Sequence, residues 1–256
     1  MNVAWRTGAL GDFVLTLPVL DRLADDGPLT VVAPLRYRAF FGRAAEWVDA
    51  DGAALTAWFA GRVTRTERWG VAWTATAADA LRACGVARVT LGPTLPAPGV
   101  HAADSLWEPL CERFGARDRD PRINTSPSSD PAAPVVLAPG SGGAAKRWPL
   151  DRWRAVASRL NRPVLWVGGP NERDEGGWGI PRRDDLDLAG LVALAGRCAA
   201  WLGPDSGPCH LARAVGARVG VVFGHASDPT QWAPLGATVF RWDIAPERIA
   251  DWANAP

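Results

Sequence analysis

The sequence contains almost no lysine, methionine or tyrosine. Only one of its 28 basic residues is a lysine, Lys146, and the other 27 are arginines. A bias towards GC-rich codons accounts for this composition, because arginine then replaces lysine wherever a positive charge is enough. The one lysine therefore indicates a position that calls for a compact ammonium group rather than a planar guanidinium.

Several classes of protein are excluded by what the chain lacks. Its four cysteines form no CxxC pair and do not bracket histidines at zinc-finger spacing. The sequence has no run of about 18 apolar residues, so it predicts no membrane span. The formal net charge is +1, and no basic stripe with interleaved aromatics predicts nucleic-acid binding. The first residues lack the pattern of a signal peptide, so we expect a cytoplasmic protein with free thiols.

Short β-rich apolar runs alternate with helical patterns along the chain, which predicts a parallel α/β architecture. Residues 120–134, rich in Pro, Ser and Asp, predict a linker. We therefore expect one Rossmann-like domain over residues 1–125 and a second over residues 126–256, facing a central cleft. The expected strands are Asn2–Trp5, Leu29–Ala33, 88–91, 135–138, Val164–Val167 and 218–223. The expected helices are 12–24, 77–84, 104–114, 150–160, 191–200, Gly207–Val215 and 242–255, and residues 171–187 are expected to form a loop.

The first strand leads into a turn with two glycines, Gly8 and Gly11, and then into a helix at Asp12. Glycines let backbone approach a ligand closely, so Gly11 is a candidate substrate-binding residue. The G-x-x-G spacing is not the dinucleotide fingerprint, which argues against an NAD-dependent oxidoreductase. Asp12 has two interpretations, an acid favoured by the helix dipole or a general base facing the cleft.

The second half opens with a loop of small residues that contains Ser141, Gly142 and Lys146. Such a loop after a buried strand can wrap a phosphate with its backbone N–H groups. It is not a P-loop, because Ala145 and Arg147 replace the required Gly and Ser/Thr. Lys146 precedes the next helix, where its ammonium could reach a diphosphate; the alternative is a solvated surface lysine.

A third loop, Gly-Pro-Asp-Ser-Gly-Pro-Cys-His, follows a short strand-like run and contains Asp205, Ser206, Gly207 and His210. The start of its helix offers free N–H groups as an anion site, and Asp205 could accept hydrogen bonds from sugar hydroxyls. The alternative is a capped helix with a structural histidine. A fourth loop carries Glu172 after Gly-Gly-Pro, where a carboxylate could bind ribose hydroxyls or simply lie exposed.

Together, these segments resemble glycosyltransferase family 9, the ADP-heptose:lipopolysaccharide heptosyltransferase family. The resemblance rests, in order, on the Gly-Asp turn at residues 8–12, the Pro-Gly…Lys-Arg-Trp-Pro run, the Gly-Gly-Pro…Glu turn and Asp-Ser-Gly-Pro-x-His. It implies a GT-B fold and an inverting glycosyltransferase that needs no metal and no cofactor. The donor is then a nucleoside-diphosphate sugar, with an ADP-sugar carrying heptose or a related hexose favoured, and the acceptor is a saccharide or glycolipid hydroxyl.

The resemblance also implies roles for single residues. Asp12 becomes the general base, and Lys146 neutralises the diphosphate. Ser141 and Gly142 approach the phosphates. The ribose is bound by Glu172, the donor sugar by Asp205, and the diphosphate also by Ser206, Gly207 and His210 at the helix start.

Two other functions remain open at this point, a non-catalytic nucleotide-sugar-binding protein and a sugar epimerase of the same fold. An epimerase needs a histidine near the sugar, and the N-terminal half offers only His101. The acceptor side is expected in that half, where Arg62, Arg65 and Arg68 form one group of arginines. A second group, Arg36, Arg38 and Arg43, lies among Tyr37, Phe40 and Phe41. These arginines could bind an acidic glycolipid or the inner face of the membrane, or they could be ordinary solvated surface.

Overall fold

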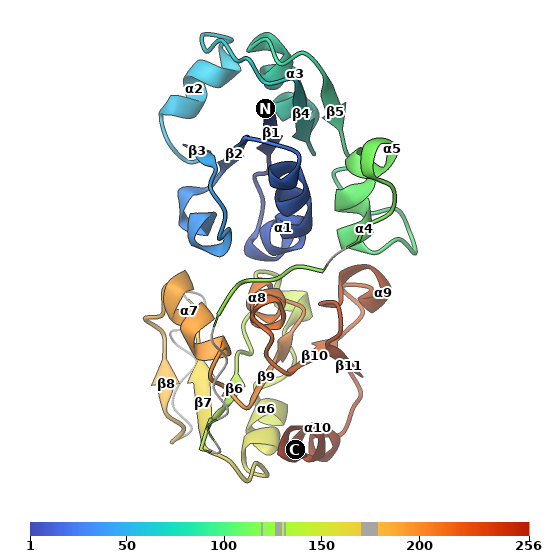
Figure 1. Cartoon of the computed structure of the whole chain (residues 1–256). Helices are drawn as coiled ribbons and strands as arrows, with labels where there is room; N and C mark the ends of the chain where they lie inside the picture. Colours follow the sequence, from blue (N-terminus) through green and yellow to red (C-terminus); the bar gives the residue numbers. More distant parts are fainter. Residues whose placement is uncertain (119, 126–129, 131, 170–178, 256) are drawn as a thin grey trace. The chain divides into compact units, whose positions relative to one another are not determined.

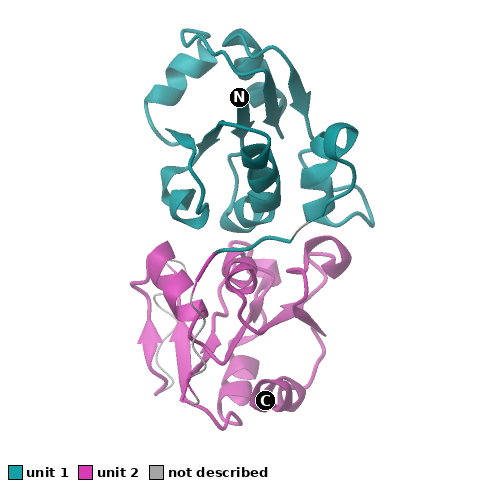
Figure 2. Cartoon of the chain, viewed as in Figure 1, with its two compact units in different colours: residues 1–123 teal, residues 124–256 magenta. Residues whose placement is uncertain are grey.

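A computed structural model of the chain describes residues 1–118, 120–125, 130, 132–169 and 179–255. The chain divides into two compact units, Met1–Ile123 and Asn124–Pro256 (Figures 1 and 2). Each unit has a parallel sheet with helices on both faces, and the two are described separately below.

Unit 1 is built on a five-stranded sheet with the strand order β3-β2-β1-β4-β5, in which each neighbouring pair is parallel. This is the order of a Rossmann-like sheet, and the order reverses between β1 and β4. The strands are β1 (Asn2–Trp5), β2 (Leu29–Ala33), β3 (Glu46–Asp49), β4 (Trp69–Ala72) and β5 (Val89–Leu91). The helices are α1 (Leu10–Asp25), η1 (Leu35–Phe40), α2 (Ala54–Phe59), α3 (Ala75–Ala83), α4 (Ala102–Trp107), η2 (Glu108–Leu110) and α5 (Cys111–Phe114).

The alternation of side chains in β1 explains how this sheet is covered. Val3 and Trp5 point into a core made with α2 and α3, where Trp58 packs edge-on against Trp5. Asn2 points the other way, and its amide donates a hydrogen bond of 2.9 Å to the Leu23 carbonyl in α1. Because both faces are covered, the central strands are mostly apolar, and the polar Asn2 and Thr30 in them are buried and hydrogen-bonded.

Unit 2 repeats this plan with a six-stranded parallel sheet in the order β11-β10-β9-β6-β7-β8. Counted along the chain from β6, this is the Rossmann order 3-2-1-4-5-6, which reverses between β6 and β9. The strands are β6 (Val135–Leu137), β7 (Val164–Val167), β8 (Arg182–Arg183), β9 (Ala200–Pro204), β10 (Val219–Phe223) and β11 (Thr238–Arg241). The helices are η3 (Ala144–Lys146), α6 (Leu150–Ala157), α7 (Leu188–Ala195), α8 (Gly207–Val215), α9 (Pro229–Trp232) and α10 (Pro246–Asn254).

Tryptophans fill one face of the second sheet. Trp148, just before α6, and Trp153, within it, pack against each other with ring centroids 4.9 Å apart and share a buried cluster with Trp166 of β7 and Ile249 of α10. Burial of such rings stabilises the unit by a few kcal/mol each. The loops that carry the candidate site thus follow strands of a closely packed sheet.

Some expected elements differ from those in the structure. The helix expected at 104–114 is broken into three short pieces, because Pro109 lacks the N–H that a continuous helix needs. The helix expected at 191–200 ends at Ala195, and strand β9 begins at Ala200. β8 lies within the stretch expected to be a loop. Strands β3, β4 and β11 were not predicted from the sequence.

Candidate functional site

Two candidate loops of unit 2 meet where the strand order of its sheet reverses. The loop after β6 carries Ser141 and Lys146, and the loop after β9 carries Asp205 and Ser206. β6 and β9 are neighbouring parallel strands, with Leu137 paired to Leu202. Their carboxyl ends therefore lie side by side, at the position where sheets of this kind bind ligands.

Lys146 and Asp205 form an ion pair across these loops. The Lys146 ammonium donates a hydrogen bond of 2.6 Å to the Asp205 carboxylate. The Asp205 side chain is 7% exposed, whereas that of Lys146 is 35% exposed. Lys146 is therefore not a freely solvated surface lysine. A buried carboxylate fixes one side of its ammonium and leaves the other side open to solvent.

Ser141 fastens the first loop to the second. Its hydroxyl donates a hydrogen bond of 3.0 Å to the backbone carbonyl of Asp205, and the Arg147 guanidinium donates one of 3.1 Å to the Ser141 carbonyl. Gly142, next in the loop, has open space where a side chain would stand, with no atom within 4 Å of a Cβ built there. The loop is thus held at Ser141 and leaves the backbone of Gly142 accessible.

Helix α8 begins directly after Asp205, with Ser206 at the N-cap position and Gly207 as its first residue. Within the described part of the chain, the Ser206 hydroxyl bonds to Cys209 Sγ at 3.5 Å rather than capping a helix N–H. His210 is buried in the first turn, and its backbone N–H donates to the Ser206 carbonyl. Burial raises the pKa of the Cys209 thiol to about 12, so this cysteine is not a nucleophile at neutral pH.

Asp12 lies in the first turn of α1, at the carboxyl end of β1 in unit 1. One carboxylate oxygen accepts the Ala9 backbone N–H at 3.3 Å, and the other pairs with Arg6 at 3.3 Å. The carboxylate therefore does stabilise the start of the helix. It is also 29% exposed, and its two contacts are long, so it keeps lone pairs that a substrate proton could reach.

Arg6 is a site residue that the sequence interpretation missed. It is 7% exposed and lies over the Trp73 ring, 5.7 Å from its centroid, at the point where the order of the first sheet reverses. Burial lowers the pKa of the Arg6 guanidinium, and the nearby Asp12 charge opposes that shift. Among the described residues, Arg6 Nε has no hydrogen-bond partner. The only sequence signal was an arginine at the end of the first strand.

Gly8 keeps one side of the Asp12 carboxylate open. A Cβ at Gly8 would lie 3.2 Å from Asp12 Oδ2 and 3.7 Å from Arg6 Nε. The Gly8 carbonyl accepts a hydrogen bond of 3.3 Å from the Tyr37 hydroxyl of η1. The glycine therefore leaves room beside the carboxylate, and η1 holds the turn in place.

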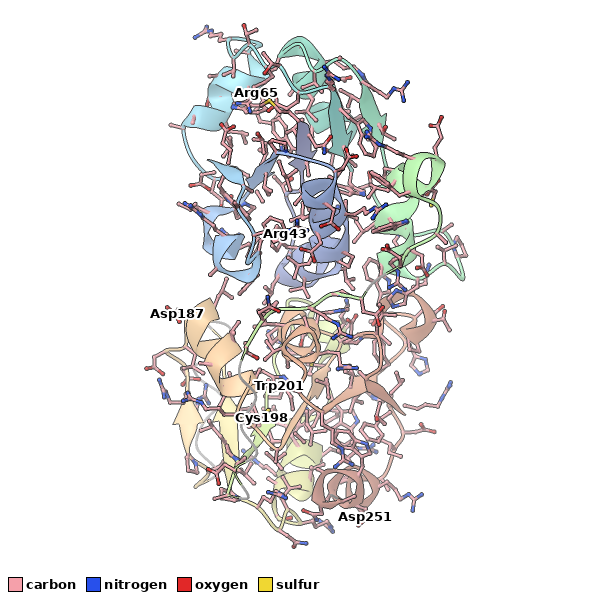
Figure 3. The ribbon with its side chains drawn as sticks, viewed as in Figure 1. Arg43, Arg65, Asp187, Cys198, Trp201 and Asp251 are labelled. Carbon is pink, nitrogen blue, oxygen red and sulfur yellow. The ribbon has the colours of Figure 1, made fainter. Side chains whose placement is uncertain are left out.

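The first group of candidate arginines lies at the amino ends of the strands in the unit 1 sheet, the end opposite to Asp12. Arg65 and Arg68 precede β4, so they are at the amino ends of the strands, whereas Asp12 follows a carboxyl end. Arg65, labelled in Figure 3, pairs with the buried Glu67 and with Glu46 and lies over the Trp58 ring of α2. Arg65 is therefore a structural residue and cannot form part of an acceptor surface.

The second group of arginines follows β2, at the carboxyl ends of the strands, where Asp12 also lies. Arg36 pairs with Asp51, and Arg43 pairs with Asp25. Tyr37, Phe40 and Phe41 are buried, although Phe41 borders a surface recess. A recess of about 720 Å³ lies here. Its lining comprises Leu35, Arg36, Arg38, Ala39, Phe41, Arg43, Ala44, Ala45 and Trp47.

Comparison with known proteins shows which family part of this chain is similar to. Residues 181–243 match the model of glycosyltransferase family 9 (heptosyltransferase). The glycosyl transferase family 9 structure from Veillonella parvula superposes with a TM-score of 0.80 at 18% identity, over 98% of this chain and 94% of that one. The resemblance to glycosyltransferase family 9 is confirmed. The matched segment includes Asp205, Ser206, Gly207 and His210, whereas Asp12 and Lys146 lie outside it.

Two further structures extend the likeness in fold. ADP-heptose LPS heptosyltransferase II of E. coli has a TM-score of 0.77 at 16% identity, covering 99% of this chain and 98% of that one. E. coli heptosyltransferase WaaC with ADP has a TM-score of 0.75 at 15% identity, covering 100% of both chains. The chain therefore has the GT-B fold of these glycosyltransferases. No curated protein matches the sequence.

Two residues singled out in the sequence, Glu172 for the family resemblance and His101 for the epimerase alternative, are not part of the assembled site. Glu172, the proposed ribose ligand, lies outside the described residues. His101 caps α4, where its Nδ1 accepts the Ala103 N–H at 3.1 Å, so it gives an epimerase no support. Within residues that the structure describes, no group of three or more His, Cys, Asp or Glu is arranged to hold a metal ion. In the same part of the chain, no helix has the length and apolar character needed to cross a membrane.

Proposed function

We propose that this protein is an inverting glycosyltransferase that moves a sugar from a nucleoside-diphosphate sugar to a hydroxyl of a saccharide or glycolipid. The observation that carries the proposal is the Lys146–Asp205 pair at the point where the second sheet reverses its order. The single lysine of the chain is held there beside the start of α8. In this proposal unit 2 binds the donor and unit 1 the acceptor.

The donor diphosphate would lie between the Lys146 ammonium and the start of α8. An anion there meets a point charge, the positive end of a helix dipole and the backbone around Gly207. The exposed backbone of Gly142 adds a further N–H group on the other loop. An adenine nucleotide is favoured, since the similar WaaC structure holds ADP. Heptose or a related hexose is the sugar that the family likeness favours.

Asp205 would contact the donor sugar while it holds Lys146. Its carboxylate has two oxygens, and the Lys146 bond uses Oδ2. The other oxygen can accept a hydrogen bond from a sugar hydroxyl. The Asp205 side chain is nearly buried, so its orientation is fixed before the donor arrives, which reduces the entropy lost on binding.

The reaction would be a direct displacement at the anomeric carbon. The acceptor oxygen forms a bond to that carbon as its proton passes to the Asp12 carboxylate. The bond from carbon to the leaving phosphate oxygen breaks, and the nucleoside diphosphate takes that electron pair. Lys146 and the α8 N-terminus stabilise the developing charge, an effect worth about 3 kcal/mol for a typical group of this kind. These groups can do so without a metal.

The acceptor is proposed to approach unit 1 on the edge that carries Asp12 and η1. Among the described residues, Arg38 lacks an ion-pair partner, and it lies beside the exposed Leu35 and the Arg36–Asp51 pair. An arginine next to apolar surface suits an acidic sugar on a lipid. The same surface could touch anionic lipid from the cytoplasm, where each charge adds about 1 kcal/mol.

A donor screen tests the proposal directly. The protein would be incubated with ADP-, GDP- and UDP-sugars and a mixed saccharide acceptor in EDTA, with products followed by mass spectrometry. We expect transfer from one donor class, ADP-sugars first, and loss of transfer in Asp12→Asn. Nucleotide-sugar binding without transfer to any acceptor would instead indicate a binding protein.

A further inference from the structure

Arg6 lies one residue beyond β1, at the carboxyl end of the strand, and its backbone continues the sheet. The Arg6 N–H donates a hydrogen bond of 2.9 Å to the Val32 carbonyl of β2. Side chains alternate between the two faces of a sheet, and Trp5 points into the core that β1 forms with α2 and α3. The Arg6 side chain therefore points to the opposite face, which α1 covers. Asp12, in the first turn of α1, lies on that face.

Trp73 lies against the Arg6 guanidinium. Trp5 of β1 pairs with Ala72 of β4. The residues that follow them, Arg6 and Trp73, are therefore neighbours as well. Arg6 Cζ lies 5.7 Å from the centroid of the Trp73 ring, a distance at which a cation and an aromatic ring attract each other. The ring is buried, and its indole N–H donates a hydrogen bond of 3.1 Å to the Leu106 carbonyl in α4. A ring fixed in this way restricts the guanidinium.

Asp12 is the only carboxylate that forms an ion pair with Arg6 among the described residues. Arg6 Nη2 lies 3.3 Å from Asp12 Oδ1, which is longer than the roughly 2.7–2.9 Å of a charge-assisted hydrogen bond. The Arg6 side chain is buried, whereas that of Asp12 is partly exposed. The arginine is therefore fixed by its surroundings, and it aligns the carboxylate without a short bond that would occupy its lone pairs.

The two oxygens of the Asp12 carboxylate have different neighbours. Oδ1 faces Arg6, whereas Oδ2 accepts the Ala9 N–H at 3.3 Å. Oδ2 also borders the open space beside Gly8, where a Cβ would lie 3.2 Å away. Arg6 and Ala9 thus hold the carboxylate at two points, and the oxygen turned to the open side is Oδ2. If Arg6 is removed, Ala9 alone holds the carboxylate, and its rotation is less restrained.

We propose that Arg6, held in place by Trp73, is the positioning residue for the Asp12 carboxylate during sugar transfer. This inference rests on the proposed function, in which Asp12 takes the proton of the acceptor. Arg6 acts through Asp12, because it keeps Oδ2 turned to the side from which the acceptor hydroxyl approaches. A displacement of about 1 Å at a reacting group costs about a hundredfold in rate. Loss of Arg6 therefore lowers kcat and leaves the binding of both substrates intact.

Arg6→Met removes the charge and keeps an apolar side chain over the Trp73 ring. Transfer is measured with ADP-heptose as the donor and lipopolysaccharide oligosaccharides as the acceptor. We expect kcat to fall by about tenfold or more, while the KM for the acceptor and the Kd for ADP are unchanged. Arg6→Lys keeps a cation beside Asp12 and should recover most of the lost rate.

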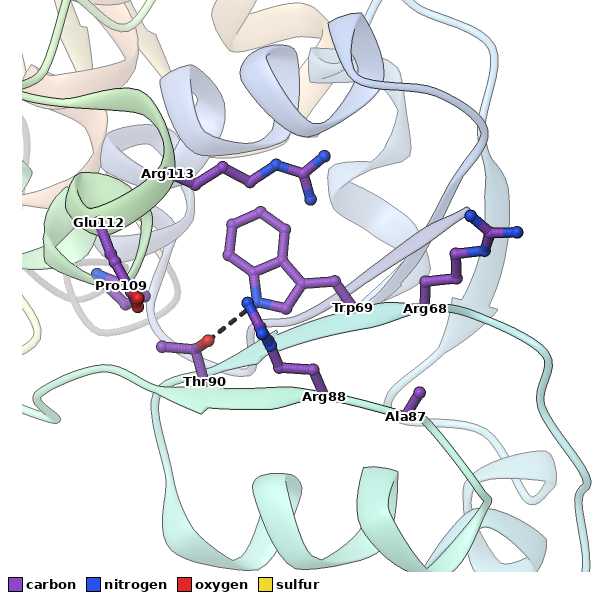
Figure 4. A pocket seen from close by; sticks show the side chains of 8 residues that line it. All are labelled: Arg68, Trp69, Ala87, Arg88, Thr90, Pro109, Glu112 and Arg113. Carbon is purple, nitrogen blue, oxygen red and sulfur yellow. Dashed lines mark hydrogen bonds between the residues drawn. The ribbon is translucent and has the colours of Figure 1, made fainter.

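Arg113 provides a matched control in the same unit. It lies over the ring of Trp69, 5.2 Å from its centroid (Figure 4), and it pairs with Asp26 at 2.7 Å. Asp26 is at the C-terminal end of α1, whereas Asp12 is in the first turn of that helix. Arg113→Met therefore removes an arginine that also combines a tryptophan ring with an aspartate, at the end of α1 away from the proposed base. It should transfer sugar as wild type does.

A double-mutant cycle distinguishes positioning from a separate role of Arg6. In the Asp12→Asn background the base is already lost, so Arg6→Met should slow transfer no further. Urea unfolding of the same four proteins measures the pair without any turnover. Because the two side chains are in contact, their effects on stability should be non-additive.

The inference is overturned if Arg6→Met keeps the kcat of wild type, if it slows transfer no more than Arg113→Met, or if it acts by raising the KM for the acceptor. It is also overturned if Arg6→Met slows Asp12→Asn by the same factor as wild type. Full turnover in Asp12→Asn contradicts the proposed base, and this inference falls with it. A slow Asp12→Asn beside a fully active Arg6→Met overturns this inference alone. If wild type transfers no sugar, the proposed function fails, and additive effects on unfolding then show that Arg6 does not hold Asp12.

Discussion

The Lys146 ammonium lies 2.6 Å from the Asp205 carboxylate, although the two residues are 59 positions apart in sequence. In the free protein, the lysine proposed to neutralise a diphosphate is already paired with a nearly buried acid. Removing either partner therefore leaves the charge of the other uncompensated and its position less restrained. This pairing distinguishes Lys146 in the proposed donor site from a lysine that only lies near a phosphate.

Asp205→Asn should separate the two roles given to Asp205. Without the carboxylate, Lys146 keeps its full charge for the diphosphate, so ADP should bind more tightly by about 0.5–1 kcal/mol. Sugar transfer should slow by about tenfold or more, because the charged hydrogen bond to the sugar is lost. Calorimetry with ADP and a transfer assay measure the two effects. Weaker ADP binding with unchanged transfer would refute this assignment.

Asp12→Asn should slow transfer by about 10²–10⁴-fold while ADP affinity stays the same. An amide can still accept the Ala9 N–H, but it cannot take the proton of the acceptor. Arg6 loses its ion pair, so some loss of thermal stability is expected as well. Asp79→Asn, an exposed acid on α3, is the matched control. Wild-type turnover in folded Asp12→Asn would show that the base lies elsewhere.

Two glycines of unit 2 should respond oppositely to alanine. At Gly203 a Cβ would stand 2.6 Å from the Ala138 carbonyl oxygen and 2.9 Å from Cys209 Sγ. Gly203→Ala should therefore lower the free energy of unfolding by about 1–3 kcal/mol. Gly142→Ala meets no atom and should change stability by less than about 0.5 kcal/mol, yet weaken ADP binding. Urea unfolding and calorimetry separate the two effects. A stable Gly203→Ala, or unaltered ADP affinity in Gly142→Ala, would contradict the respective argument.

The Arg65 network should make unit 1 sensitive to acid. The Arg65 hydrogen bond lowers the pKa of Glu46. Burial acts to raise the pKa of Glu67, but hydrogen bonds from Arg65 and other groups lower it overall. A carboxylate whose pKa is lowered in the folded protein stabilises the fold at pH values above its usual pKa of 4.5. This contribution is lost as the pH falls below that value.

Glu67→Gln measures that contribution. At pH 7 the variant should be less stable than wild type by about 3 kcal/mol, because Arg65 loses its buried partner. The difference should shrink as pH falls below 4.5, because Glu67 takes up a proton in the unfolded wild-type chain before it does so in the folded protein. Urea unfolding at pH 7, 5 and 4 gives the comparison. A difference that stays constant over this range would mean that the Glu67 charge does not stabilise the fold.

The sequence predicted the main features of the fold because they are local. β-rich runs and glycine turns mark β1, β2, β7 and the loops after β6 and β9, and the family likeness supplied the GT-B architecture. The break in the predicted helix at 104–114 was also predictable, since Pro109 cannot continue a helix. β3 and β11 are four-residue strands at the edges of their sheets. β4 lies between β1 and β5, and its buried apolar run Trp69–Ala72 was a signal that the sequence interpretation missed.

The charged pairs could not be predicted, because they depend on contacts between distant segments. Arg65 resembles Arg62 and Arg68 in sequence, but only the fold brings Glu46 beside it. The Lys146–Asp205 pair needs β6 and β9 to be neighbours, which follows from strand order and not from either motif. Arg6 appeared to be one arginine among many until its burial was known.

Calorimetric titration of ADP in EDTA into wild type and Lys146→Ala tests the central claim most directly. The account predicts that wild type binds ADP without a metal. In the variant, a buried Asp205 carboxylate is left facing the phosphates, so affinity should fall by at least about 1.5–3 kcal/mol. Absence of ADP binding by wild type, or equal affinity in folded Lys146→Ala, would contradict the proposed donor site.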